Sequence, residues 1–365
     1  MATRDTVLQI VPRLPGTFDG VGDYALNLAR ALSVDYGIDT TFLVAEKTSV
    51  STRDRFTIVS GLNPARSAEL ARGHAHVILH YANYGYQARG VPFALRDFVK
   101  QLRQQLRGRW VTMFHELYAS GPAWQSAFWL RPFQVRIAHD LIDASSCCVV
   151  SNVPIEQAIH AYDSKKKIRT IPVMSNLGEP ELTDFAVASS RRWVVCGGTA
   201  LIARSLRRLE ELLPLIPSPF APDHLDVVGG RPDSLVVAAI DRLKRGFSVH
   251  HYPEVSVDLA SEVLRQSAFG WLDYFGEGKV WPGMVLKSGA FAALCAHGVI
   301  PIVSHREDRI AIDGDPLPGP FCLTPSELHF PKPDELPAVR RSCYDWYQAH
   351  ASSRETARAY AEELR

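Results

Sequence analysis

The sequence lacks the features that mark secreted, membrane-spanning and zinc-knuckle proteins. Its six cysteines among 365 residues include no C-x-x-C pair, which disfavours a zinc knuckle or a thioredoxin-type site. No run of about 18 apolar residues is present, so no segment is expected to span a membrane. The polar N-terminus has no apolar core of about 7–15 residues, as a signal peptide would. We therefore expect a cytoplasmic protein.

An excess of charge of either sign is also missing. Forty Lys and Arg residues against 39 Asp and Glu residues give a net charge of +1, whereas a general nucleic-acid binder needs a basic excess. Hydrophobic residues make up 46% and charged residues 22%, as in an average soluble protein, which excludes a disordered chain. We expect no nucleic-acid partner. At roughly 100–200 residues per domain, the length predicts two domains.

Short apolar runs alternate with amphipathic segments along most of the chain. Val7–Pro12, His76–His80 and Trp110–Phe114 are continuously apolar or nearly so, as in parallel strands covered on both faces. The alternation stops at Ile168–Leu182, where prolines and a glycine indicate a linker, and restarts at Trp193–Cys196. The pattern predicts an α/β protein with two doubly wound, Rossmann-like domains.

The predicted boundaries place an N-terminal domain at 1–175 and a second domain at 176–335. A helical tail at 336–365 is expected to pack back on the N-terminal domain. Ligands of such sheets bind beyond the carboxyl ends of the strands. The strand-to-helix loops are therefore the candidate sites, and we expect the ligand cleft between the two domains.

The first such loop carries Gly20 and Gly22. Glycines let the backbone approach a phosphate, and a helix start supplies N–H groups to it, although an ordinary strand-to-helix turn would use the same residues. The loop is not G-x-G-x-x-G, which disfavours a nicotinamide cofactor, and no cofactor is expected.

His115 follows a predicted strand and could bind a sugar hydroxyl or transfer a proton, or simply cap the strand. Ala119 replaces the second histidine of H-E-x-x-H, so no catalytic metal is expected.

Two aromatic clusters lie in this half of the chain. One follows the His76–His80 run and has the composition of a sugar-binding loop, with packing on its own domain as the alternative: Tyr81, Asn83, Tyr84 and Tyr86. The other is expected to belong to the core: Trp124, Phe128 and Trp129.

The second half opens with Gly198 after a strand and Arg204 in the following helix, where the guanidinium could reach a diphosphate or stand in solvent. Further on, Lys287, Ser288 and Gly289 precede the apolar helix Ala290–His297. Backbone N–H groups at that helix start, together with the lysine charge, predict an anion pocket. An ordinary helix start with a serine N-cap is the alternative.

The order of these motifs resembles the GT-B glycosyltransferases, and Asp19–Leu32 resembles most closely the retaining family 4 enzymes. The resemblance covers nearly the whole chain in architecture, and it is strong in motif at Gly20–Leu32, His115 and Ala296–Val303. It implies a GT-B fold whose two domains face a cleft. It further implies retaining transfer of a sugar from a nucleotide-diphosphate sugar to a saccharide, lipid-linked or small-molecule acceptor. We expect this transfer to be metal-independent, because no DxD-like acidic cluster accompanies these loops.

The same resemblance implies roles for individual residues. Donor binding would fall to Gly20, Gly22, Arg204, Ser288 and Gly289, and contact with the transferred sugar to His115. From the residues themselves we add Gly198 and Lys287 to the donor site and assign acceptor binding to the Tyr81–Tyr86 loop. The chain departs from the family where two glutamates are usual, since Val285 and Ala293 occupy those positions. Glu277 could replace the first of them as a catalytic carboxylate. Lys287 could replace an arginine that the family has at the position of Gly198.

Two other functions stay open. One is a nucleotide-sugar epimerase or hydrolase of the same fold, which would need an acidic group such as Glu116, Asp273 or Glu277 for proton abstraction. The other is a non-catalytic partner protein that binds a nucleotide sugar. The basic segment Val91–Arg109 leaves a peripheral membrane contact possible.

Overall fold

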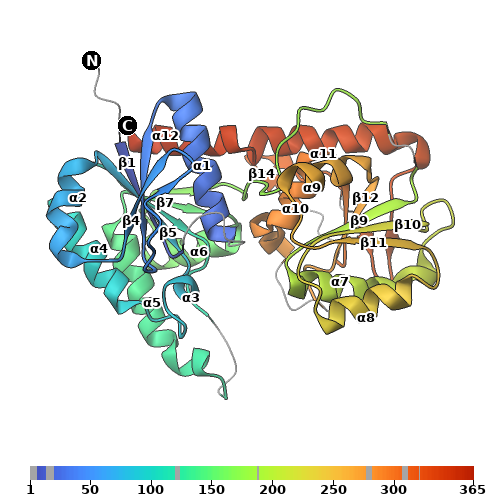
Figure 1. Cartoon of the computed structure of the whole chain (residues 1–365), viewed down its shortest axis with the longest axis horizontal. Coiled ribbons are helices and arrows are strands. Elements are labelled where there is room, and N and C mark those ends of the chain that lie inside the picture. The colour runs from blue at the N-terminus through green and yellow to red at the C-terminus, as the bar shows by residue number, and fades with distance from the viewer. Residues whose placement is uncertain are drawn as a thin grey trace. The chain divides into compact units, whose positions relative to one another are not determined.

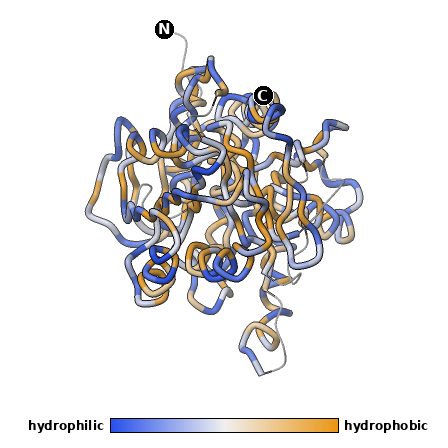
Figure 2. Tube along the Cα trace, turned by 90° about the vertical axis from the view of Figure 1, so that its right-hand side faces the viewer, coloured by the Kyte–Doolittle hydropathy of each residue, from blue (hydrophilic) through white to orange (hydrophobic). Residues whose placement is uncertain are grey.

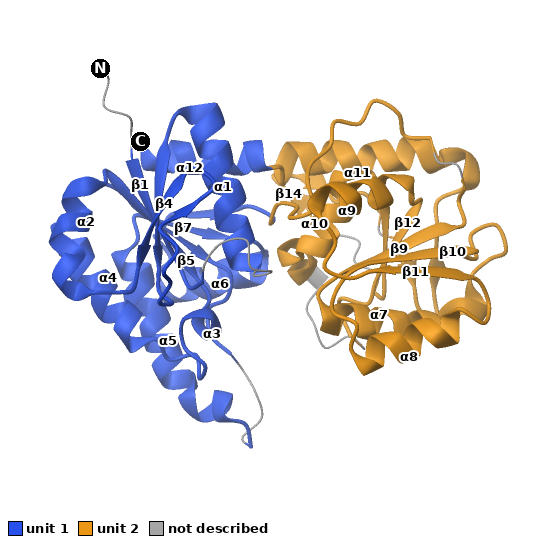
Figure 3. Ribbon diagram, in the orientation of Figure 1, with its two compact units in different colours: residues 1–172, 353–365 blue, residues 173–352 orange. Residues whose placement is uncertain are grey.

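The computed structural model describes residues 6–13, 20–119, 124–186, 189–276, 282–305, 311–319 and 321–365. The chain divides into two compact units, which Figure 3 distinguishes by colour. Unit 1 comprises residues 1–172 and 353–365, and unit 2 comprises residues 173–352. The chain therefore passes from one unit to the other twice.

Unit 1 contains an eight-stranded sheet in the order β3-β4-β2-β1-β5-β6-β7-β8. Every neighbouring pair is parallel except β3 with β4. The strands are β1 Thr6–Val11, β2 Asp39–Val44, β3 Thr52–Arg53, β4 Phe56–Ser60, β5 His76–Tyr81, β6 Trp110–Phe114, β7 Cys147–Val150 and β8 Ile168–Thr170. β1, β5, β6 and β7 are buried almost throughout, which explains their apolar sequences.

Helices cover both faces of this sheet (Figure 1). α1 packs against α12 on one face, while α2, α4 and α5 pack in succession on the other. The helices of unit 1 are α1 Gly20–Tyr36, α2 Ser67–Gly73, α3 Asn83–Tyr86, α4 Phe93–Gln105, α5 Ser126–Ala144, α6 Val153–Tyr162 and α12 Ser353–Leu364, with a 3-10 turn at Pro64–Arg66.

Unit 2 contains a seven-stranded sheet in the order β11-β10-β9-β12-β13-β16-β17, in which only the β16–β17 pair is antiparallel. α7 and α8 cover one face, and α9, α10 and α11 cover the other. Its strands are β9 Arg192–Gly197, β10 His224–Gly229, β11 Ser248–Tyr252, β12 Phe269–Leu272, β13 Ile300–Val303, β16 Cys322–Leu323 and β17 Leu328–His329, with a separate hairpin of β14 Ala311–Ile312 and β15 Asp315–Pro316. Its helices are α7 Thr199–Leu212, α8 Ser234–Leu243, α9 Val257–Gln266, α10 Gly289–Ala296 and α11 Leu336–His350, with 3-10 turns at Leu213–Leu215, Pro282–Lys287 and Pro333–Glu335.

The order of strands positions the candidate sites. In each sheet the chain moves outward from a first strand and later returns to that strand's other side. This reversal falls between β1 and β5 in unit 1 and between β9 and β12 in unit 2. Ligands of doubly wound sheets bind beyond the carboxyl ends of the strands at such a reversal. Figure 2 shows hydrophobic and hydrophilic stretches alternating along the trace.

Several predicted segments differ from the observed ones. The predicted linker contains an edge strand, β8, which pairs with β7. The predicted tail is two helices, α11 in unit 2 and α12 in unit 1, separated at residues 351–352. Gly20 and Gly22 belong to the first turn of α1 rather than to a loop before it.

Candidate functional sites at the two sheet reversals

In unit 1, the reversal between β1 and β5 carries a chain of polar side chains. Gln9 lies on β1 and His80 on β5, both fully buried, and His115 follows β6 directly and is half-buried. His80 Nε2 lies 2.8 Å from Gln9 Oε1, and His115 Nε2 lies 3.5 Å from His80 Nδ1. The buried pair of Gln9 and His80 therefore links the interior of the sheet to His115, which lies just beyond the carboxyl end of β6.

This chain of contacts orients the His115 ring. An amide oxygen only accepts hydrogen bonds, so the proton of neutral His80 is assigned to Nε2 and its Nδ1 is left as an acceptor. His115 then donates from Nε2, which leaves the lone pair of neutral His115 on Nδ1. Burial, assisted by the neighbouring His115, holds the pKa of the His80 imidazole well below its usual value, so His80 stays neutral.

Tyr24 of α1 packs against both His80 and His115. Its ring contacts both imidazoles edge-on, with centroids 5.7 Å from His80 and 5.2 Å from His115. Its hydroxyl lies 3.5 Å from the Tyr360 hydroxyl of α12. Gln9, His80 and Tyr24 were not among the residues predicted from the sequence to form a site. A glutamine inside an otherwise apolar strand was the available signal for Gln9.

The predicted acceptor-binding residues have different environments. Tyr81 and Asn83 are fully buried, and Tyr81 packs edge-on against Phe114. The Tyr86 hydroxyl donates to the backbone oxygens of Ile10 and His80, so its visible role is to hold the loop to the sheet. Tyr84 is 40% exposed and is the member of the group with the most surface to offer a ligand.

The second aromatic cluster is not part of the core, and this prediction was wrong. Trp124 is 86% exposed, Trp129 is 68% exposed and Phe128 is 46% exposed. Phe128 and Trp129 lie in the first turns of α5, which begins at Ser126 and continues through Pro132. Phe128 and Trp129 contact each other edge-on, with ring centroids 5.2 Å apart, yet both side chains remain largely exposed.

In unit 2, two helix starts meet at the reversal between β9 and β12. Gly198 is the N-cap of α7, and Ser288 is the N-cap of α10. A side chain at Gly197 would lie 3.4 Å from the Cβ atom of Ala290, so the two starts are neighbours. Gly197 adopts a φ of +132°, which favours glycine, and a Cβ atom at Gly198 would meet no atom of the described residues within 4 Å. The helix dipoles make this place attractive to an anion.

Hydrogen bonds show which groups remain for a ligand at the start of α10. The Ser288 N–H donates to Val285 O, and the Ser288 hydroxyl accepts from Phe291 N at 3.2 Å. The prediction that Ser288 offers its own N–H to a ligand is therefore wrong. The N–H groups of Gly289 and Ala290 have no acceptor among the described residues. Gly289 and Lys287, which lies two residues before it, are both partly exposed, so this helix start reaches solvent.

Arg204 is held by the loop after β12. Its Nε donates to Asp273 O at 2.7 Å, its Nη2 donates to Tyr274 O at 3.2 Å, and Nε also lies 3.4 Å from the Asp273 carboxylate. Arg204 thus links α7 to the loop after β12, and its side chain is 37% exposed. Asp273, one of the carboxylates considered for proton abstraction, is nearly buried and paired with this cation.

The positions where the resembling family has glutamates are apolar and closed. Val285 is 2% exposed and Ala293 is fully buried inside α10. Glu277, the predicted substitute, lies outside the described residues. Glu116 is exposed beside His115.

No protein-family model matches the chain, and no curated protein matches its sequence. Solved structures do match. An α-glucosyltransferase in complex with UDP superposes with a TM-score of 0.61 at 10% identity, covering 99% of this chain and 100% of that one. The fold is GT-B. An α,α-trehalose 6-phosphate synthase from Burkholderia multivorans gives a TM-score of 0.61 at 13% identity, covering 99% of this chain and 98% of that one.

A third GT-B-like neighbour is a putative UDP-N-acetylglucosamine 2-epimerase from Listeria monocytogenes, with a TM-score of 0.50 at 10% identity, covering 84% of this chain and 80% of that one. Identities this low establish the fold alone, and the GT-B architecture predicted from the sequence is confirmed. No helix in the described part of the chain is both long and apolar enough to cross a membrane.

Proposed function

We propose that this chain is a glycosyltransferase that moves a sugar from a nucleotide-diphosphate sugar to an acceptor hydroxyl. The observation that carries the proposal is the meeting of the α7 and α10 starts at the strand reversal of unit 2. We assign the donor diphosphate to this place, bound by the N–H groups of Gly289 and Ala290 and by the charge of Lys287. Gly198 leaves room for the phosphates beside α7.

During transfer, the bond between the anomeric carbon and the diphosphate breaks, and its electrons go to the diphosphate oxygen. The acceptor oxygen bonds to that carbon, and its proton passes to the departing diphosphate oxygen. Fixed helix dipoles and the lysine charge stabilise the growing negative charge of the leaving group, which is the largest electrostatic contribution that these residues can make. We assign metal-independent transfer to the enzyme on this basis, and retention on its resemblance to family 4.

We assign His115 the contact with the transferred sugar, and Tyr84 with its loop the contact with the acceptor. The Gln9–His80 pair supports this role because it fixes which His115 nitrogen carries the proton. Arg204 is assigned a positioning role: it holds Asp273 and Tyr274 beside α7. UDP is the first nucleotide to test, since similar folds have been solved with it.

The first experiment is a thermal-shift screen of the whole chain with UDP, GDP, ADP and TDP. A nucleotide at 100 times its Kd would stabilise the protein by about 2.7 kcal/mol. Gly289→Asp tests the diphosphate assignment most directly, because a carboxylate at a helix start stabilises the helix but repels a diphosphate. A Cβ atom there would make only ordinary contacts, the nearest with Asn176 Oδ1 at 3.5 Å. Gly289→Asn is its neutral control. Equal nucleotide binding by both variants would refute the diphosphate assignment.

Product analysis separates the other functions. A transferase consumes the nucleotide sugar and releases the nucleoside diphosphate only when an acceptor is glycosylated. An epimerase or hydrolase gives a new nucleotide sugar or free sugar with no acceptor present, and a non-catalytic binding protein gives neither. Because the Asp273 carboxylate is paired with Arg204, it is a poor candidate for the base of an epimerase.

A further inference from the structure

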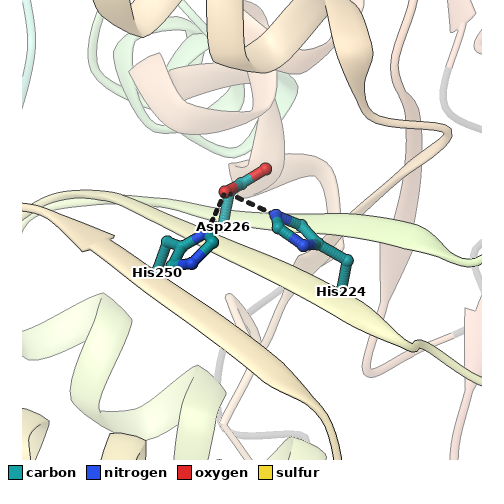
Figure 4. Close-up of side chains that lie close together, drawn as sticks. All are labelled: His224, Asp226 and His250. Carbon is teal, nitrogen blue, oxygen red and sulfur yellow. Dashed lines mark hydrogen bonds and ion pairs between the residues drawn. The ribbon is translucent and has the colours of Figure 1, made fainter.

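Two histidines and an aspartate converge on the outer strands of the unit 2 sheet, away from the glycine-rich carboxyl ends. His224 and Asp226 are the first and third residues of β10, and His250 lies directly opposite Asp226 on β11. Residues two apart on one strand share a face, and residues in register on neighbouring strands do so too. Figure 4 shows the Asp226 carboxylate between the two imidazole rings.

The carboxylate divides its two oxygens between different partners. Arg192 of β9 binds Oδ2 through Nε at 3.0 Å and Nη2 at 2.9 Å. Oδ1 lies 3.0 Å from His224 Nε2 and 4.0 Å from His250 Nδ1. Asp226 is fully buried, so Arg192 fixes the orientation of the carboxylate and leaves Oδ1 to the histidines. Ligating carboxylates commonly have this kind of hydrogen-bonded support on the second oxygen.

The spacing of the three candidate ligand atoms suits a transition metal. The two imidazole nitrogens and the carboxylate oxygen all lie within 4.8 Å of one another. Metal–ligand distances of about 2.0–2.2 Å require ligand atoms roughly 3–4 Å apart. The separations from Oδ1 already fall in that range, and the His250 side chain is 57% exposed, so a small rotation can bring its nitrogen closer.

The chemistry of the three ligands narrows the choice of ion. Imidazole nitrogens suit zinc, copper and nickel, whereas magnesium and calcium prefer oxygen ligands alone. We propose that His224, Asp226 and His250 bind one divalent transition-metal ion, with zinc as the physiological candidate. The ion joins edge strand β11 to β10 and keeps at least one coordination position open to water through the exposed side of His250. These residues lie in the amino-terminal and middle parts of their strands. The metal site is therefore separate from the proposed diphosphate site, which lies beyond the carboxyl ends of the strands.

The test is a calorimetric titration of the chelator-treated whole chain with zinc chloride near neutral pH. All six cysteines are buried in the folded protein, so their thiols do not compete at the surface. His250→Ala removes an exposed ligand without disturbing the buried Arg192–Asp226 pair. His224→Gln is the second variant, because the glutamine amide can still donate to Oδ1 yet is a poor zinc ligand. His74→Ala, which removes one unit 1 histidine, is the matched control.

We expect one zinc ion per native chain and an affinity at least about tenfold weaker in both His250→Ala and His224→Gln, with His74→Ala unchanged. Cobalt in place of zinc should give visible d–d bands without thiolate charge transfer, and these bands should disappear in His250→Ala. Native protein that binds no zinc at equimolar concentration would overturn the proposal. So would equal affinity in the native chain and the two ligand variants, because adventitious surface binding would then account for the metal.

Discussion

His115 Nε2 faces the Nδ1 atom of His80 at 3.5 Å, with the two rings stacked at an interplanar angle of 27°. A partly exposed imidazole is thus oriented by a buried one, which is itself bound by Gln9. This arrangement gives His115 a preferred tautomer before any ligand arrives.

His115→Ala should lower sugar transfer by about 10²–10³-fold, as expected for loss of one positioned hydrogen-bonding group that contacts the transferred sugar in the transition state, while the Kd for the nucleoside diphosphate stays nearly constant. Steady-state kinetics and calorimetry measure the two effects. His74→Ala is the control and should behave as the native chain does. Turnover that is unchanged in His115→Ala would remove His115 from the mechanism.

Lys287→Ala should weaken binding of the nucleoside diphosphate by about 1.5–3 kcal/mol, as expected for loss of a charge-assisted contact. The equivalent change in affinity is roughly 10–150-fold. Lys244→Ala, at the exposed carboxyl end of α8, removes the same charge elsewhere in unit 2 and should leave affinity unchanged. Calorimetry on the two variants decides the matter, and equal Kd values would rule out Lys287 as a phosphate ligand.

His297 should make the protein less stable in acid. Its ring binds Ala293 O at 2.7 Å and the Ser261 hydroxyl at 2.9 Å, and burial lowers its pKa to about 4. The unfolded chain protonates this residue at a pKa of about 6.5. The unfolded state therefore binds more protons between these values, and stability falls as the pH drops from about 6.5 to 4, by roughly 3 kcal/mol in total.

Urea denaturation across that pH range measures the effect. His297→Asn keeps a donor near Ala293 O and does not titrate, so its stability should fall less steeply with acid, although its stability at neutral pH is lower. His80 contributes in the same direction in both proteins, because burial lowers its pKa too. Parallel slopes for the two proteins would contradict the assignment to His297.

Gly229→Ala should destabilise the protein by about 1–3 kcal/mol. Gly229 has a φ of +91°, and an added Cβ atom would lie 2.7 Å from Gly197 O. Gly198→Ala is the matched comparison: it has an ordinary φ of −75° and open space around it, so its stability should change little. Denaturant midpoints compare the two, and similar losses would show that the backbone at Gly229 can relax.

The fold could be predicted where burial alone decides the structure. Trp110–Phe114 has the same bounds in the sequence prediction and in the structure, because strands covered on both faces must be apolar throughout. The start of α5 could not be predicted, since its exposed aromatic residues resemble a core segment in composition.

The candidate sites were predictable only in part, because their partners depend on strand register. Gln9 and His80 lie 71 residues apart, and the pairing of β1 with β5 brings them together. Arg204 was recognised as a cation near a helix start, but its partner Asp273 lies 69 residues further along the chain. Single-residue patterns show that such side chains exist and do not show which of them meet.

The helix α12 completes unit 1 although about 180 residues of unit 2 precede it in the chain. Its Glu363 carboxylate, 4% exposed, binds Arg169 at 2.8 Å and Lys167 at 2.6 Å, beside β8. A ribosome therefore finishes unit 2 before it supplies the last part of unit 1. Unit 1 stays incompletely covered until α12 has been synthesised, and a nonsense codon after residue 352 would harm the unit that was translated first.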